Sequence, residues 1–351
     1  MSLYDSISDL PVTVDEWQLS LHERETSSDF TRTTTVIELH GDGETGYGED
    51  VTYASEAHYR FNEDAELPPL TGAYAFDEFS EMVGELDLFP ESDPEQSSAR
   101  NYRRWAFESA ALDLASKQAD TTLGEVLGRE YDPVRFVVST RLGEPPTFDR
   151  IETLLEVDSA LEFKLDPTEE WTPDLVERLA ETDAVRILDL KGQYEGTDVD
   201  QSGDPDLYEM VADAFADAII EDPDLTEETR PIIEAASDRV SWDYPITGVD
   251  SVESLPWEPN WLNIKPSRFG SVRSLLATIE HCEDRDIRLY GGGQFELDVG
   301  RAHIQALASL FYPDAPSDVA PGGYNDPEPQ AGLPSSPLSP PDERQGLAWR
   351  P

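Results

Sequence analysis

The stretch DAIIEDP, residues 217–223, decides the fold, because a short apolar run ends in an acidic residue and then turns at Asp-Pro. Similar runs surround it: AVRILDL at 184–190, RVSWD at 239–243 and WLNIK at 261–265. The charged residues that end these four runs are 32, 22 and 22 residues apart, and each interval suits one strand followed by one helix. Such alternation predicts an α/β fold with a parallel sheet.

Three further runs extend the series: RFVVS at 135–139, ALEFKL at 160–165 and IRLYGG at 287–292. No Gly-rich phosphate loop follows the first run, so a barrel is favoured over an open dinucleotide-binding sheet. The sequence therefore predicts a modified TIM barrel, (β/α)7β. In such a barrel, functional side chains project from the carboxyl ends of the strands.

The N-terminal part has a different pattern. VTVDEWQLSL and RTTTVIEL alternate in the manner of antiparallel strands, and ARNYRRWAFESAALDLASKQ at 99–118 predicts a long helix, since it is rich in Ala and lacks Gly and Pro. We expect an α+β capping domain at 1–130 and the catalytic barrel at 131–320.

Residues 321–351 form a Pro-rich C-terminal arm. Disorder is one interpretation of this composition. Packing on the body is the other, because the arm contains Tyr324, Leu333, Leu338 and Trp349, which a solvating tail does not need.

The chain is strongly acidic. Its 75 Asp and Glu against 25 Lys and Arg give a net charge of −50, which repels nucleic acid and anionic membranes. The acids are spread along the whole length, as in proteins kept hydrated in concentrated salt, so we expect a halophilic archaeal host. A single cysteine, no long apolar run and no secretory pattern at the start lead us to expect a cytoplasmic protein.

Asp189, Glu221 and Asp243 end consecutive runs, so their carboxylates are expected to meet at one end of the barrel. Three carboxylates form an oxygen-rich site for a hard cation, Mg²⁺ first and Mn²⁺ second. The alternative is that each acid caps a helix at its turn. A bound cation can hold a substrate carboxylate and stabilise the enolate that forms when the α-proton leaves.

Lysine is rare in the chain, and its distribution supports a catalytic site. Of four lysines, Lys164, Lys191 and Lys265 follow or end predicted strands. An amine whose pKa is tuned by its surroundings can act as a base, so Lys265 is the expected catalytic lysine. Ion pairs with neighbouring acids are the alternative for all three.

These residues resemble the enolase superfamily, in the branch of muconate-lactonizing enzyme and o-succinylbenzoate synthase within the mandelate racemase/muconate lactonizing enzyme family. The segments that resemble it are ALDLASKQADTTLGEVLG at 111–128, IIEDP at 219–223, LNIKPSRFG at 262–270 and YGGGQFELDVGRAHIQALASL at 290–310. The resemblance implies metal ligands at Asp189, Glu221 and Asp243, a catalytic Lys265, and at Lys164 the first lysine of a Lys-x-Lys pair.

The chain departs from that family at two positions. The second lysine of Lys-x-Lys is Asp166 here, which is expected to be a general acid or base, or a turn residue before Pro167. The third-strand Asp-x-Asn reads Asp189-Leu190-Lys191, which adds an amine near the metal. Tyr47 and Glu49 lie in the cap loop, where the resembling family selects its substrate, and a hairpin turn is the alternative. Lys191 and Glu296 are further candidate substrate-binding residues. Lys191 could instead pair with an acid, and Glu296 could orient a lysine or only support its loop.

The number of catalytic bases expected in the site favours a lyase over an epimerase. With Asp166 in place of a lysine, one base remains, which suits a lyase of the dehydratase or cycloisomerase kind on a small carboxylate substrate. An epimerase, which needs bases on both faces of the α-carbon, is the alternative. A barrel that has lost catalysis and acts as a binding protein is the alternative of another class. A homo-oligomer is left open.

The charge predicts how salt affects stability. As salt is removed the charges repel one another without screening, whereas at molar salt the Debye length is only about 3 Å. We expect the melting temperature to fall steadily from about 3 M to about 0.1 M KCl in a series of thermal melts. A melting temperature that stays level or rises on dilution would contradict the halophilic interpretation.

Overall fold

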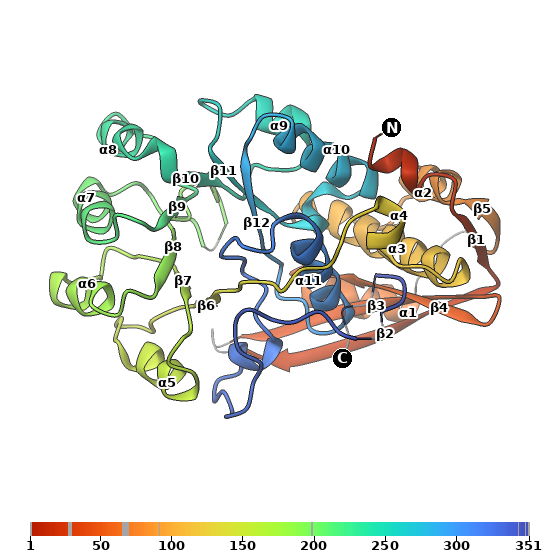
Figure 1. Cartoon of the computed structure of the whole chain (residues 1–351), viewed down its shortest axis with the longest axis horizontal. Helices are drawn as coiled ribbons and strands as arrows, with labels where there is room; N and C mark the ends of the chain where they lie inside the picture. Colours follow the sequence, from red (N-terminus) through yellow and green to blue (C-terminus); the bar gives the residue numbers. More distant parts are fainter. Residues whose placement is uncertain are drawn as a thin grey trace.

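A computed structural model of the chain describes residues 2–26, 30–64, 70–90, 92–197, 199–342, 344–347 and 349. A curved parallel sheet with helices on its outside forms one part of the molecule, and an α+β domain built from the N-terminal residues lies beside it (Figure 1). The α/β, TIM-barrel-like architecture with a separate N-terminal domain is therefore confirmed. No helix among the described residues is long and apolar enough to cross a membrane.

The N-terminal domain is built on antiparallel strands, with the long predicted helix packed against them. Its strands are β1 (Pro11–Val14), β2 (Glu16–Glu25), β3 (Thr31–Gly41), β4 (Glu44–Asp50) and β5 (Gly72–Ala75). Its helices are η1 (Tyr4–Ser6), α1 (Ser55–Asp64), α2 (Phe76–Gly84), α3 (Ser98–Gln118) and α4 (Leu123–Leu127). A Cβ at Gly48 would lie 1.9 Å from the carbonyl oxygen of Ala106, so only glycine lets β4 approach α3 this closely.

The parallel sheet contains every apolar run that the sequence singled out, in chain order. Its strands are β6 (Val138–Thr140), β7 (Phe163–Leu165), β8 (Val185–Asp189), β9 (Ile219–Glu221), β10 (Val240–Trp242), β11 (Trp261–Ile264) and β12 (Arg288–Gly291). Between and after them come α5 (Asp149–Val157), α6 (Pro173–Ala180), α7 (Pro205–Ala214), α8 (Arg230–Ala235), η2 (Ser237–Arg239), α9 (Val249–Glu253), η3 (Pro266–Phe269), α10 (Val272–Glu283) and α11 (Val299–Phe311).

A short segment around Ser317 spans the gap between the last strand and the first. The carbonyl oxygen of Ser317 accepts from the Val137 N–H at 2.9 Å, just before β6. On the other side the Gly291 N–H of β12 donates to Ser317 Oγ at 3.0 Å, and the Asp318 N–H donates to the Gly291 carbonyl at 2.7 Å. The segment therefore links the two edges of the curved sheet.

The interior of the sheet is apolar at one end and polar at the other. Val137, Ile187, Ile219 and Tyr290 form a buried apolar cluster. Side chains alternate across a strand, so residues two positions further along face the same interior. In β8 and β9 these are Asp189 and Glu221, at the carboxyl ends of the strands, so alternation alone brings charged groups to one end of the barrel.

The described residues of the C-terminal arm pack against both parts of the molecule. Tyr324, in η4 (Gly322–Asn325), is fully buried, and its ring centroid lies 5.8 Å from that of Phe136. Leu338 pairs with Val134 through two backbone hydrogen bonds. Further on, the Leu347 N–H donates to Asp113 of α3 at 2.8 Å. The arm thus joins the barrel to the long helix of the N-terminal domain.

Tyr324→Ala tests whether this packing stabilises the fold. Removing a fully buried aromatic ring leaves a cavity, and we expect a loss of about 3 kcal/mol in the free energy of unfolding by denaturant. Tyr59→Ala is the matched control, because Tyr59 is 37% exposed and should cost less than about 1 kcal/mol. Equal losses in the two variants would show that the arm contributes little.

Candidate active site

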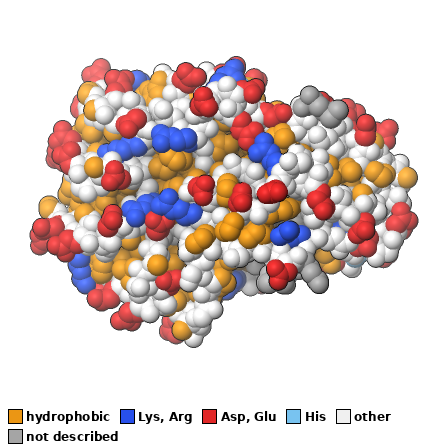
Figure 2. Space-filling model, viewed as in Figure 1, with side chains coloured by type: hydrophobic (Ala, Val, Ile, Leu, Met, Phe, Trp, Pro, Cys, Tyr) orange, Lys and Arg blue, Asp and Glu red, His pale blue; other side chains and the backbone are white. Residues whose placement is uncertain are grey.

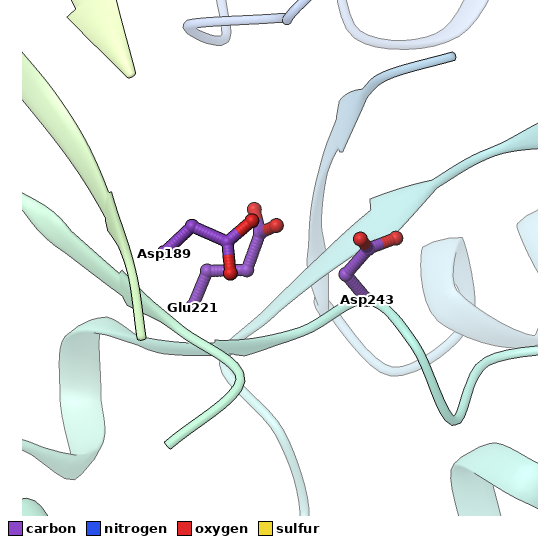
Figure 3. A group of neighbouring side chains, drawn as sticks. All are labelled: Asp189, Glu221 and Asp243. Atoms are coloured by element: carbon purple, nitrogen blue, oxygen red, sulfur yellow. The ribbon is translucent and has the colours of Figure 1, made fainter. Parts of the chain in front are cut away.

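Three carboxylates meet at the carboxyl ends of neighbouring strands. Asp189 ends β8, Glu221 ends β9, and Asp243 directly follows β10 (Figure 3). All three side chains are fully buried, and one oxygen from each lies within 4.8 Å of the others. Asp189 and Glu221 are register partners, which explains why their carboxylates lie side by side. The carboxylates that the sequence predicted to meet are therefore together.

The donor set fits a divalent cation. The three ligand atoms are carboxylate oxygens, which hard cations prefer. Asp243 Oδ1 is buried and has no hydrogen-bond partner among the described residues, and neither has Asn263 Oδ1 of β11. Buried oxygens rarely lack a partner, and a cation bound by the three carboxylates would satisfy Asp243 Oδ1.

Lysine side chains approach the carboxylates from the strands on both sides. Lys164 of β7 is 2% exposed, and its Nζ lies 3.0 Å from Asp189 Oδ2 and in contact with Glu221. Lys265, directly after β11, places its Nζ 2.9 Å from Asp243 Oδ2. In the strand order, the three carboxylates of β8 to β10 thus lie between Lys164 and Lys265.

Burial and charge pairing act in opposite directions on these groups. Burial alone would lower the pKa of Lys164, but Asp189 and Glu221 raise it well above its usual range. Burial would raise the pKa of Asp189, but Lys164 and Lys191 hold it well below its usual range. The carboxylates of Asp189 and Glu221 thus favour the charged form of Lys164.

Glu221 is in a different position. Burial, and then the nearby charge of Asp189, raise the pKa of Glu221 well above its usual range. Its oxygens accept from Tyr290 Oη and, at 3.2 Å, from Asn263 Nδ2. These donors hold the Glu221 carboxylate toward the other two.

Asp166 and Lys191 lie together. Lys191 Nζ contacts Asp189 and is 3.7 Å from Asp166 Oδ1. Arg141 approaches Asp166 from the other side, with Nε 3.6 Å from Oδ2. Burial raises the pKa of Asp166, although Lys191 acts against this. The structure therefore places an amine from β8 beside the position where the resemblance would have a second lysine on β7.

Two residues near Asp243 were missed by the sequence reasoning. Arg268 is buried, with Nη2 3.4 Å from Asp243 Oδ2, and Tyr194 Oη donates to the same oxygen at 2.9 Å. Arg268 stands in the LNIKPSRFG segment, where η3 turns it back toward the site, and the Arg268 N–H donates to the Lys265 carbonyl at 2.9 Å. Its presence beside Lys265 in that segment was the available signal. Tyr194 follows β8 in a loop, and no feature of the sequence around it pointed to the site.

The remaining predicted substrate-binding residues make hydrogen bonds to groups other than the three carboxylates. Glu49 accepts from the N–H groups of Leu297, Asp298 and Gly300 at 2.6, 3.0 and 2.8 Å, so it caps the start of α11. The Tyr47 N–H donates to Asp113 of α3 at 3.0 Å.

Glu296 is 5% exposed and lies in the loop after β12. Its Oε1 accepts from the Gln294 N–H at 2.9 Å. This contact supports the loop, and it involves backbone rather than a lysine. Glu49, Tyr47 and Glu296 are thus held by contacts with α11, α3 and the β12–α11 loop.

Curated relatives are enzymes. The chain is 24% identical over 301 residues to the o-succinylbenzoate synthase of Geobacillus stearothermophilus, which covers 80% of this chain and 74% of that one. It is 24% identical over 251 residues to the o-succinylbenzoate synthase of Bacillus subtilis strain 168, covering 68% of this chain and 65% of that one. The chain thus spans about two thirds to three quarters of these relatives.

Solved structures share the fold. A dipeptide epimerase from Methylococcus capsulatus complexed with Mg superposes with a TM-score of 0.70 at 18% identity, covering 96% of this chain and 99% of that one. A member of the enolase superfamily from Listeria innocua superposes with a TM-score of 0.64 at 20% identity, covering 89% of this chain and 86% of that one. The fold is that of the enolase superfamily, and these relatives support a lyase or an isomerase.

Two family models match in succession. The model described as the N-terminal domain of a domain of unknown function, DUF8230, matches residues 5–126, and the C-terminal domain of the same family matches residues 130–326. Since the C-terminal model alone matches more than half of the residues, the chain belongs to the DUF8230 family.

Proposed function

We propose that the chain is a metal-dependent enzyme that removes the proton from the carbon next to a substrate carboxylate. The observation that supports this best is the group of Asp189, Glu221 and Asp243, buried together with a lysine on each side. A divalent cation held by these three residues, Mg²⁺ first and Mn²⁺ second, would stabilise the negative charge that develops on the substrate carboxylate.

The lysines have separate roles in this proposal. Lys164, kept charged by Asp189 and Glu221, binds the substrate carboxylate as an ammonium. Lys265 takes the α-proton from the other side of the carboxylate group and then, as an ammonium, gives a proton to the departing group. Arg268 and Tyr194 hold Asp243 Oδ2 and so fix the carboxylate that Lys265 contacts. One base is enough for an elimination, so a lyase is the first candidate.

An epimerase is the second candidate, and one contact favours it. Lys191 Nζ lies 3.7 Å from Asp166, so an amine is present on the side of the carboxylate group opposite Lys265. Although Asp166 replaces the second lysine of the Lys-x-Lys pair, an amine is therefore still present on this side of the carboxylate group. It belongs to Lys191, which follows β8, rather than to a residue of β7. A two-base reaction with Lys191 and Lys265 is compatible with this placement.

The acidic surface bears on the salt concentration in which the enzyme works. Asp and Glu side chains are scattered over the face of the molecule in Figure 2 rather than gathered in one patch. Such a surface is suited to concentrated salt, because the dissolved ions screen the repulsion between acidic side chains. We propose a cytoplasmic enzyme of a salt-rich cell, acting on a small carboxylate.

Removing one carboxylate should weaken metal binding. We expect Asp189→Asn, Glu221→Gln and Asp243→Asn each to raise the Kd for Mg²⁺ at least about tenfold in calorimetric titrations, because each loses a charged oxygen ligand. Glu162→Gln is the control: Glu162 pairs with Arg135 and Arg186 near the start of β7, outside the carboxylate group. A wild-type chain that binds no divalent ion would instead favour the non-catalytic binding protein.

Lysine variants should identify the reaction. With candidate carboxylates in D₂O followed by NMR, Lys265→Ala should lower turnover about 10²- to 10⁴-fold, the usual range for a lost general base. Lys117→Ala is the control, because Lys117 is the lysine of α3 and pairs with Asp113 at 2.7 Å. Deuterium uptake with inversion, abolished by both Lys265→Ala and Lys191→Ala, would replace the lyase by an epimerase. If Asp166→Asn abolished this deuterium uptake while Lys191→Ala remained active, Asp166 would be the second base.

A further inference from the structure

Strand β2 leaves one of its edges unpaired. The strand order of its sheet is β2-β3-β4, so β2 pairs with β3 on one side and with no described strand on the other. The sheet lies on the lower side of the N-terminal domain in Figure 1. Just after β2, the Thr26 N–H donates to the Phe30 carbonyl at 3.1 Å. Backbone groups alternate in direction along a strand, so the even-numbered residues of β2 bond to β3 and the odd-numbered ones point outward.

β2 also lacks the features that usually protect an edge strand. It has 10 residues, and its sequence, EWQLSLHERE, contains no Lys and no Pro, which ordinarily discourage pairing. Leu21 is 38% exposed and is one of three large apolar side chains that are exposed among the described residues. The segment WQLSLH, residues 17–22, contains no carboxylate, although the chain has 75 acidic residues. The middle of this edge is therefore suited to receive another strand.

The sequence of β2 is complementary to itself in the antiparallel orientation. With a two-fold axis at Ser20, the outward-pointing backbone groups of Leu19 meet those of Leu21 in a second copy. Those of Trp17 meet those of Glu23 in the same way, and each such pair exchanges two hydrogen bonds. The two leucines then lie next to each other on one face of the joined sheet, where each covers apolar surface of the other.

The same register brings opposite charges together on the other face of the sheet. Glu16 of one copy lies opposite Arg24 of the other, and the two-fold axis makes this pair occur twice. No other antiparallel register places an acid of this row opposite Arg24, because Glu16 is the only acid among the even-numbered residues of β2. Arg24 contacts Asp326 of the arm but is 40% exposed, so other N–H donors of its guanidinium are open to a second copy.

We propose that the protein forms a homodimer in which the β2 strands of two copies pair antiparallel about Ser20. Their N-terminal sheets then become one continuous sheet, and neither copy keeps an open edge at β2. The proposal does not rest on the proposed function, because β2 supplies no residue to the carboxylate group. Each copy carries a net charge of −50, so repulsion opposes the contact and concentrated salt favours it by screening.

Leu21→Lys tests the edge itself. Size-exclusion chromatography with light scattering, over a dilution series of the full chain in concentrated KCl, should give the wild type a mass about twice the 39.2 kDa of one chain. Leu21→Lys should raise the dissociation constant of the dimer at least about tenfold, because a lysine on an edge strand discourages pairing. Glu253→Arg is the control, since Glu253 is exposed at the end of α9 in the barrel, and it should change the constant less than about twofold.

Charge variants test the register at the lowest KCl concentration in which the chain stays folded. Glu16→Arg and Arg24→Glu each place like charges opposite one another in the dimer, and each should raise the dissociation constant about tenfold. An equal mixture of the two variants should restore dimers, because every position then faces an opposite charge. Within one chain, residues 16 and 24 are about 26 Å apart at roughly 3.3 Å per residue, so this restoration requires two chains.

Three outcomes would overturn the dimer. The first is a wild-type chain that stays monomeric at the highest concentration, and the second is an assembly that Leu21→Lys does not split. The third is a mixture of the charge variants that forms no more dimer than either variant alone. Circular dichroism of each variant separates loss of pairing from loss of folding, and a Leu21→Lys chain that does not fold leaves the charge variants to decide.

Discussion

Charges inside the barrel must be paired, and the rest of the site depends on that requirement. Moving one ion out of water costs several kcal/mol, which is offset only by close partners of opposite charge. Lys164, Asp189 and Glu221 are each at most 2% exposed, and each contacts another member of the group. Removing one member leaves its neighbour buried and uncompensated, so the positions of the carboxylates and of the lysines are set together.

The parts of the site that follow from strand alternation could be predicted from the sequence. Asp189, Glu221 and Asp243 end consecutive apolar runs, and a regular parallel sheet brings such positions together. Tyr194 could not be predicted in the same way, because it reaches Asp243 from a loop, 49 residues away along the chain. Arg268 depends on the 3-10 turn after β11, whose direction the residue pattern does not reveal. Loop geometry is decided by tertiary contacts, which local patterns do not contain.

The resemblance located residues better than it assigned their contacts. It suggested Glu49 as a substrate-binding residue, yet the carboxylate of Glu49 accepts three backbone N–H groups at the start of α11. Free N–H groups at a helix start stabilise a nearby carboxylate. At Asp166 and Lys191 the chain has an acid and an amine where the resemblance gives a lysine and an asparagine, and the two side chains lie 3.7 Å apart. The two side chains together carry no net charge here, whereas a lysine and an asparagine would carry one positive charge.

Glu49 has a consequence for how such proteins can evolve by recombination. It belongs to the N-terminal domain, but its buried carboxylate completes a helix of the barrel, and Asp113 of α3 likewise accepts the Leu347 N–H of the arm. A gene fusion that joined this barrel to a foreign N-terminal domain would leave the Gly300 N–H of α11, and the Leu297 and Asp298 N–H groups before it, without their acceptor. The two halves are therefore expected to be inherited as one piece, and new specificities in this lineage to arise by point substitution rather than by shuffling of domains.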